Sequence, residues 1–302
     1  MPIHAVITGA SGFIGAATAA DLIASGHKVT ALLRTGSNLT RLDSITSLNR
    51  LQYSSLSDSN TVTALKAYQP DVFIHCGWRG VSGQDRNEAF QVTDNIRMSM
   101  ESVELAAEVG CHRWVGLGSQ AEYGNQNRRL DETAPLRPTT LYGKAKLATG
   151  IACLALAEAR GLSSAWLRVF STYGPGDSPH WFLQYALREF RAARAPELTL
   201  CTQLWDYLHV ADAARAISAT ATTLPAIGTF NLGSGYALPL IHWIELLRRA
   251  TGCIVEPKYG VVPFRPDQVM HLEADISRLT GVTGWQPTIS PAEGVASLAA
   301  AP

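Results

Sequence analysis

Residues 7–15 read Ile-Thr-Gly-Ala-Ser-Gly-Phe-Ile-Gly, and this stretch decides the fold that the sequence predicts. The apolar run just before it is typical of a buried parallel strand, and the alanine-rich residues 16–24 are typical of a helix. Gly9, Gly12 and Gly15 therefore lie on a strand-to-helix turn. In such a turn the glycines permit the bend, the approach of a phosphate and close helix packing, so we expect a dinucleotide pyrophosphate at the helix N-terminus.

The composition excludes several classes of function. The 302 residues include 25 Lys plus Arg and 25 Asp plus Glu, so the formal net charge is zero. This balance argues against nucleic acid or a membrane surface as a partner. We expect a cytoplasmic chain without a signal peptide or a membrane span. The odd, scattered cysteines indicate reduced thiols and no metal site: Cys76, Cys111, Cys153, Cys201 and Cys253.

Strands and helices alternate through the first half of the chain, which predicts an α/β fold with a Rossmann-type doubly wound parallel sheet. After the strand that precedes Gly9, we expect strands at 27–33, 51–56, 71–76, 113–118 and 165–170. The long helices are expected at 87–109 and 140–160, with a polar loop at 124–138.

The pattern loosens beyond Gly174 and predicts a smaller C-terminal substrate lobe. We assign residues 1–173 to dinucleotide binding, with 203–238 returning to that domain in part, and residues 174–202 and 239–302 to the substrate lobe. Within these segments we expect a helix at 182–194, strand-like residues at 203–210, a tight turn at 230–235 and a helix at 241–251.

The end of the second strand bears on the choice of cofactor. NAD-binding versions of this fold place an acidic residue there to hold the ribose hydroxyls. Here the position is Leu33, followed by Arg34, with Ser37 and Arg41 nearby. Because an arginine can pair with a 2′-phosphate, the sequence favours NADP(H), with NAD(H) possible.

Three further stretches carry candidate chemistry. Tyr142 and Lys146 lie four residues apart on one predicted helix and so share a face, where an ammonium would lower the pKa of the phenol. Ser119, at a strand end, can donate a hydrogen bond to a substrate oxygen. The loop after the fourth strand offers Trp78 and Arg79 to a sugar and a phosphate; alternatively, Trp78 covers the core.

These motifs together resemble the extended short-chain dehydrogenase/reductase family, in its branch of nucleotide-sugar epimerases, dehydratases and reductases. Residues 8–15 match its cofactor motif, 119–124 its serine motif and 142–146 its catalytic pair. Later landmarks are similar over 168–175, 206–212, 230–235, Arg265-Pro266 and 284–287.

The resemblance implies roles for individual residues. Lys146 would bind the nicotinamide ribose and tune Tyr142, which exchanges a proton with the substrate oxygen that Ser119 holds. Further cofactor contacts would come from Gly9, Ser11, Gly12, Phe13, Ile14, Gly15, Arg34, Leu56, Asp58, Gly77, Asn95, Leu117 and Phe170. Substrate contacts would come from Trp78, Arg79, Ser119, Gln120, Tyr142, Ser171, His180, Trp205 and Arg265, the last on the nucleotide diphosphate.

Departures from the family pattern narrow the choice of reaction. The 4,6-dehydratases carry Asp-Glu where this chain has Gln120 and Ala121, and the epimerase/reductases of fucose nucleotides carry a cysteine at the second place. Neither residue here can transfer a proton. Ser171 and Trp205 replace an asparagine and an arginine that usually help to bind the diphosphate, and His180 alone corresponds to half of a proton-transfer pair.

The sequence therefore predicts an NADPH-dependent ketoreductase for a nucleotide-linked 4-keto-6-deoxy sugar. A nucleotide-sugar 4-epimerase with a retained cofactor is the alternative, since it uses the same three catalytic residues. A third hypothesis is a non-catalytic NADP(H)-binding regulator that keeps the fold. Relatives commonly dimerise through two long helices, so we expect a homodimer formed by 87–109 and 140–160.

Overall fold

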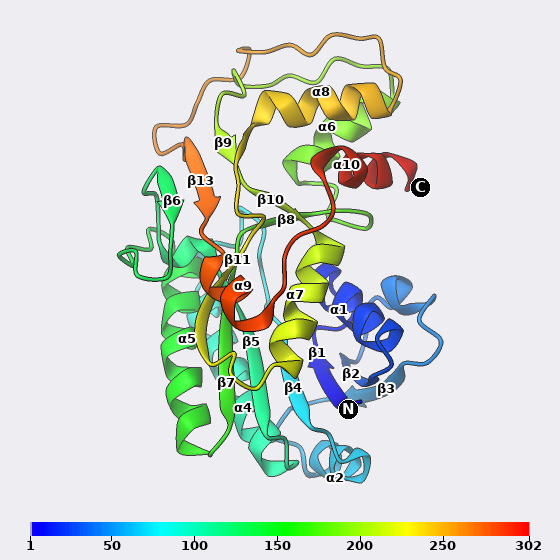
Figure 1. The fold of residues 1–302 in the computed structure, drawn as a ribbon, viewed down its shortest axis with the longest axis vertical. Coiled ribbons are helices and arrows are strands. Elements are labelled where there is room, and N and C mark those ends of the chain that lie inside the picture. Colours follow the sequence, from blue (N-terminus) through cyan, green and yellow to red (C-terminus); the bar gives the residue numbers. More distant parts are fainter. Residues whose placement is uncertain (1, 302) are drawn as a thin grey trace.

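The computed structural model describes residues 2–301, and a seven-stranded parallel sheet is its largest unit (Figure 1). The strand order β11-β7-β5-β4-β1-β2-β3 reverses direction between β1 and β4, which places a ligand crevice at the carboxyl ends of those strands. This order confirms the predicted Rossmann-type sheet. The strands are β1 (His4–Thr8), β2 (Lys28–Arg34), β3 (Asn49–Tyr53), β4 (Val72–His75), β5 (Arg113–Ser119), β7 (Ser163–Val169) and β11 (Gly228–Leu232).

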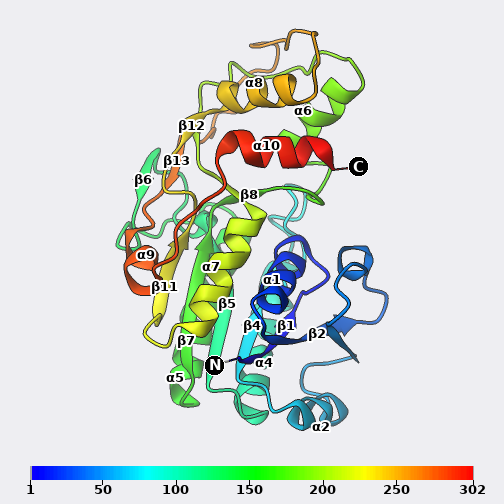
Figure 2. The ribbon, with the colours of Figure 1, turned by 45° about the vertical axis from the view of Figure 1, so that its right-hand side comes forward.

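Helices cover both faces of this sheet because successive strand residues point to opposite sides. Ile7 and Ile74 pack in the core on the side of α1 and α7, whereas Val6 and Phe73 pack in the core on the side of α2, α4 and α5. Figure 2 shows α1 and α7 next to each other on the first face. The helices are α1 (Phe13–Ala24), α2 (Ser59–Tyr68), α4 (Asn95–Glu108), α5 (Leu141–Ala159) and α7 (Val210–Thr222).

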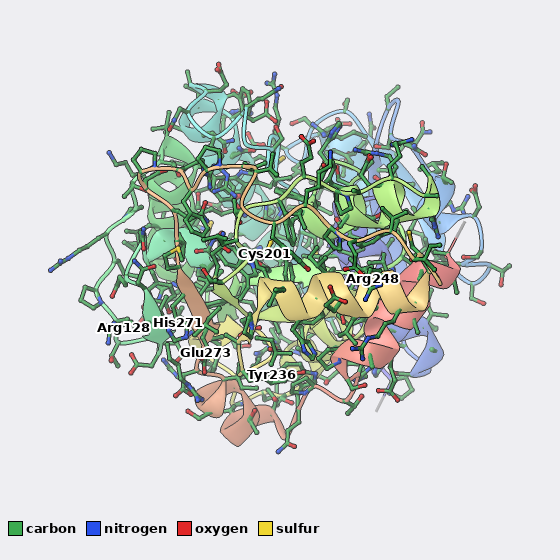
Figure 3. All side chains as sticks on the ribbon, turned by 90° about the horizontal axis from the view of Figure 1, so that it is seen from above. Arg128, Cys201, Tyr236, Arg248, His271 and Glu273 are labelled. Carbon is green, nitrogen blue, oxygen red and sulfur yellow. The ribbon has the colours of Figure 1, made fainter. Side chains whose placement is uncertain are left out.

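A smaller lobe lies beyond the carboxyl ends of the strands (Figures 1 and 2). It contains a four-stranded sheet in the order β12-β9-β13-β6 and a pair of strands, β10-β8. Viewed from above, Arg128, His271 and Glu273 on β6 and β13 lie to one side of α8 (Figure 3). Its elements are β6 (Arg128–Leu130), β8 (Ser171–Tyr173), α6 (Phe182–Arg191), β9 (Leu204–Trp205), β10 (Tyr207–His209), β12 (Leu238–Pro239), α8 (Leu240–Ala250), β13 (His271–Ala274) and α10 (Pro291–Ala300). The short helix α9 (Ser277–Thr283) instead returns to β11, and its Leu279 packs in the core of the main sheet.

The helix expected at 87–109 is present over most of its length, as α3 (Phe90–Thr93) and α4 (Asn95–Glu108), but it begins three residues later and is interrupted at Asp94. Gly80 adopts a φ of +73°, and the Gln91 side chain donates hydrogen bonds to the carbonyl oxygens of Gly80 and Asp85. These contacts stabilise the turns that precede α3.

Long-range pairing also corrects two expected loops. The tight turn expected at 230–235 is in part a strand, because Phe230, Asn231 and Leu232 pair with β7 as the seventh strand of the main sheet. The polar loop at 124–138 contributes β6, which pairs with β13 about 140 residues later. The strand-like residues 203–210 form β9 and β10, with the buried Asp206 between them.

Three properties of the described residues bear on function. None of the helices within 2–301 combines the length and apolar character needed to cross a bilayer. All five cysteines are free thiols. Across the same residues, no group of three or more His, Cys, Asp or Glu side chains is arranged to hold a metal ion.

Candidate active site

The glycine turn between β1 and α1 is shaped for a close ligand. Gly9 has a φ of +68°, and a Cβ atom there would lie 2.7 Å from the main chain of Cys76 and Gly77. A Cβ on Gly15 would overlap the carbonyl group of Gly9, so this glycine lets α1 pack against the turn. Gly12 is exposed and begins α1 without a side-chain cap, which leaves helix amides free for an anion. The turn therefore fits the pyrophosphate of a dinucleotide.

The other predicted cofactor residues differ in how they are placed. Leu33 is only 4% exposed and packs in the core, whereas Arg34 is exposed at the end of β2. Asp58 caps α2 by accepting a hydrogen bond from the Asn60 amide, at 3.3 Å. The half-buried Ser11, Phe13 and Ile14 lie at the start of α1, while Leu56 is buried.

Three predicted catalytic side chains come together where β5 meets the start of α5. Ser119 is the last residue of β5, and its hydroxyl accepts a hydrogen bond from the Ala121 amide. Tyr142 and Lys146 are 8% and 4% exposed on successive turns of α5. The Lys146 Nζ donates a hydrogen bond to the carbonyl oxygen of Leu117, at 2.7 Å, so Leu117 positions the ammonium through its main chain.

Burial controls the acid–base properties of this group. Burial raises the pKa of Tyr142 above its usual value, while hydrogen bonding with Ser119 and the positive charge of Arg86 act in the opposite direction. Burial lowers the pKa of Lys146 to about 7. The net direction is upward because desolvation outweighs the hydrogen bond with Ser119 and the positive charge of Arg86, and the tuning of the phenol by Lys146 stays a prediction.

The loop after β4 closes over these side chains. The Trp78 ring centroid lies 3.6 Å from the Lys146 Nζ, and the ring meets Tyr142 edge to face at a centroid separation of 6.0 Å. Its indole nitrogen donates a hydrogen bond to Gln91, at 2.9 Å. Trp78 thus contacts the catalytic pair instead of only covering the core. Gln91, a buried polar residue in a predicted helix, was missed by sequence reasoning.

Arg79 and Asn95 are engaged with the protein itself. The Arg79 guanidinium pairs with Asp94 at 2.7 Å on the outer surface. Asn95 is fully buried, accepts a hydrogen bond from the Arg79 amide and donates one to the Arg79 carbonyl oxygen. In this arrangement Asn95 stabilises the loop that carries Gly77 and Trp78, and its side chain is not free to bind a cofactor.

The predicted substrate residues do not all converge. Trp205 donates its indole N–H to the Ser171 hydroxyl at 2.8 Å, so the two departures from the family pattern contact each other. Gln120 is half-buried next to Ser119, whereas His180 and Arg265 are exposed on the loops before α6 and β13. Phe170 is buried in the core of the smaller lobe.

A buried ion pair supports Ser119 and was not predicted from the sequence. Glu122 accepts a hydrogen bond from the Ser119 amide at 2.9 Å and another from the Trp166 indole at 3.0 Å. Its second oxygen pairs with Arg168 at 2.7 Å, and both side chains are almost completely buried. The signal in the sequence was Arg168, a charged residue within the otherwise apolar run 165–170, whereas Glu122 lies in a polar stretch that gives no such signal.

Comparison with known proteins places the chain in a family. The profile of the family described as "NAD dependent epimerase/dehydratase family" matches residues 5–233, and the chain belongs to this family. This confirms the resemblance found in the sequence.

Individual relatives are distant but span nearly the whole chain. A dTDP-6-deoxy-L-talose 4-dehydrogenase (NAD(P)(+)) from Kitasatospora kifunensis is 28% identical over 98% of this chain and 95% of its own. A dTDP-L-rhamnose 4-epimerase from Burkholderia thailandensis is 25% identical, covering 97% and 93%. Among solved structures, MoeE5 in complex with UDP-glucose and NAD has a TM-score of 0.81 and 28% identity over 98% of this chain and 97% of that one.

Proposed function

We propose that this protein is an NADPH-dependent reductase of the keto group of a nucleotide-linked 4-keto-6-deoxy sugar. The observation that carries the proposal is the proton chemistry available beside Ser119. Tyr142 provides the hydroxyl for acid–base catalysis, one helical turn before Lys146. The two residues after Ser119 are Gln120 and Ala121, which cannot transfer protons. Such a site suits reduction of one carbonyl group and lacks the groups needed to expel water.

The residues divide the reaction between them. Ser119 donates a hydrogen bond to the carbonyl oxygen of the substrate, and Tyr142 transfers its proton to that oxygen as the alkoxide charge develops. Lys146 supplies positive charge beside the tyrosine, and Trp78 keeps the ammonium away from water. The glycine turn and Lys146 would hold the nicotinamide cofactor, which would supply the hydride that turns the ketone into a secondary alcohol.

The preference for NADP(H) follows from the end of β2. Leu33 points into the core, so no carboxylate occupies the position that selects the ribose hydroxyls of NAD. The exposed Arg34 is available to pair with a 2′-phosphate. NAD(H) remains the alternative cofactor, and MoeE5 was solved with NAD.

A 4-epimerase is the second candidate. The relatives named as dTDP-L-rhamnose 4-epimerase and UDP-glucose 4-epimerase cover at least 93% of this chain. Epimerisation would use Ser119, Tyr142 and Lys146 in both directions at one carbon, with the cofactor retained.

Cofactor consumption distinguishes the two candidates. Purified protein is incubated with NADPH and a 4-keto-6-deoxy sugar nucleotide, and separately with a saturated sugar nucleotide without added cofactor. A reductase oxidises NADPH in a one-to-one ratio with the alcohol formed. Interconversion of the saturated sugar without net oxidation of NADPH would establish the epimerase. Cofactor binding without turnover of either substrate would favour the regulator hypothesis.

A further inference from the structure

The main chain of Arg86 is hydrogen-bonded to α5, the helix that carries the catalytic tyrosine. It lies in the loop between β4 and α3, and its carbonyl oxygen accepts a hydrogen bond from the Tyr142 amide at 2.8 Å. The next residue, Asn87, accepts a hydrogen bond from the Leu141 amide at 3.0 Å. These two bonds satisfy amides in the first turn of α5, so the loop and the tyrosine are held as one unit.

The side chain of Arg86 points toward the ring of that tyrosine. Its guanidinium carbon lies 5.4 Å from the ring centroid of Tyr142. The Nε atom is buried and has no hydrogen-bond partner in the described residues. A buried donor without a partner is unfavourable for folding, and such exceptions in native proteins call for an explanation other than stability.

Lys146 also lies beside this ring, but its Nζ is engaged with other groups. Its Nζ donates to the Leu117 carbonyl oxygen, faces the Trp78 ring, and lies 6.0 Å from the Tyr142 ring centroid. A buried ammonium can lose its proton, whereas a guanidinium keeps its charge at every pH at which enzymes work. Arg86 is therefore the one of these two cations whose charge does not depend on pH.

We propose that Arg86 is a positioning residue that favours the ionised form of Tyr142 by holding a permanent positive charge against its ring. The charged groups that face Tyr142 are Arg86 from the loop, Lys146 from α5, and Glu122 from the turn after β5, where Arg168 neutralises Glu122. The catalytic consequence rests on the proposed function, but the effect on ionisation does not.

The first test measures the ionisation of Tyr142 directly, without substrate. Tyrosinate absorbance is followed against pH in the wild-type chain and in Arg86→Met, each with a Tyr142→Phe partner whose titration is subtracted. An opposite charge at this range shifts a pKa by about 1–3 units, so Arg86→Met should raise the pKa of Tyr142 by that amount. Arg86→Lys should restore most of the shift.

The matched control is Lys144→Met. Lys144 lies on the same helix two residues from Tyr142, but its side chain is exposed to solvent. Its removal should leave the Tyr142 titration unchanged, because water screens its charge. Circular dichroism at each pH restricts the comparison to folded protein, and Arg86→Gln replaces Arg86→Met if the latter does not fold.

The second test is the pH profile of kcat/KM in the direction of alcohol oxidation, where Tyr142 must accept a proton. Arg86→Met should move the rise of this profile to higher pH by the shift found in the titration, and Arg86→Lys should move it back. An unchanged Tyr142 titration in folded Arg86→Met would overturn the proposal. A shifted titration in a protein without turnover would instead contradict the proposed function and leave the role of Arg86 supported.

Discussion

At the scale of single residues, a substitution of Tyr142 can separate the catalytic role of its hydroxyl from the packing of its ring. Its ring contacts Trp78 edge to face, so Tyr142→Phe removes the hydroxyl while keeping that contact. Loss of a general acid typically lowers a rate by about 10²–10⁴-fold. We expect kcat to fall by this factor with NADPH affinity unchanged, measured by steady-state kinetics and a fluorescence titration. A parallel loss of NADPH affinity would show that the hydroxyl binds the cofactor.

Arg34 is the residue that tests cofactor choice. If it pairs with a 2′-phosphate, Arg34→Ala should weaken NADPH binding by about 1–3 kcal/mol, the contribution of a charge-assisted hydrogen bond. NADH binding should hardly change, because NADH lacks that phosphate. Isothermal titration calorimetry with both cofactors measures the difference. Equal losses for NADPH and NADH would show that Arg34 only shapes the end of β2.

The lowered pKa of Lys146 predicts that the stability of the folded chain depends on pH. Burial lowers its pKa to about 7 in the folded chain, whereas a lysine in an unfolded chain titrates near ~10.4. Between these values the unfolded chain binds more protons, so the contribution of Lys146 to stability rises as pH increases from about 7 to ~10. The Tm of the wild-type chain minus the Tm of Lys146→Met should therefore increase over this pH range. A constant difference in Tm would contradict the lowered pKa.

At the scale of elements, the pairing of Glu122 with Arg168 connects the turn after β5 to strand β7. Glu122→Gln keeps the shape of the side chain but leaves the Arg168 charge without its partner in a buried place. Breaking such a pair costs about 3–5 kcal/mol, which urea unfolding measures. Glu104→Gln is the matched control, since Glu104 and Arg160 form an exposed pair whose loss should cost about 0–1 kcal/mol. Equal effects would show that burial does not matter here.

At the scale of the whole molecule, the outer faces of α4 and α5 are the surface on which we propose that two copies meet. Ile151 is 65% exposed on α5, and the apolar part of a groove of about 610 Å³ beside α4 includes Val92, Ile96, Met100, Leu105 and Leu156, next to charged residues. Light scattering at micromolar concentration should give the mass of a dimer. Ile151→Glu should give a folded monomer, because it introduces charge into the contact without touching the core. A wild-type monomer would refute the proposal.

Local sequence determined much of this protein. The contacts of Gly12 and Gly15 with Gly9 lie within one turn, and the pairing of Tyr142 with Lys146 depends only on helical periodicity. The alternation of strand and helix then defines the parallel sheet, because each βαβ unit is a local structure. These features could be predicted since the interacting residues are close along the chain.

Only the tertiary structure decided the features that join distant segments. The pairing of β11 with β7 and of β6 with β13 overrode local turn and loop signals. Trp205 meets Ser171 across 34 residues, and Arg86 reaches Tyr142 across a longer separation. The tertiary structure also determines that the pKa of Tyr142 is raised, because desolvation depends on everything packed around the ring. Periodicity along the chain carries no information about such contacts, which arise only when separate elements bury one another's surfaces.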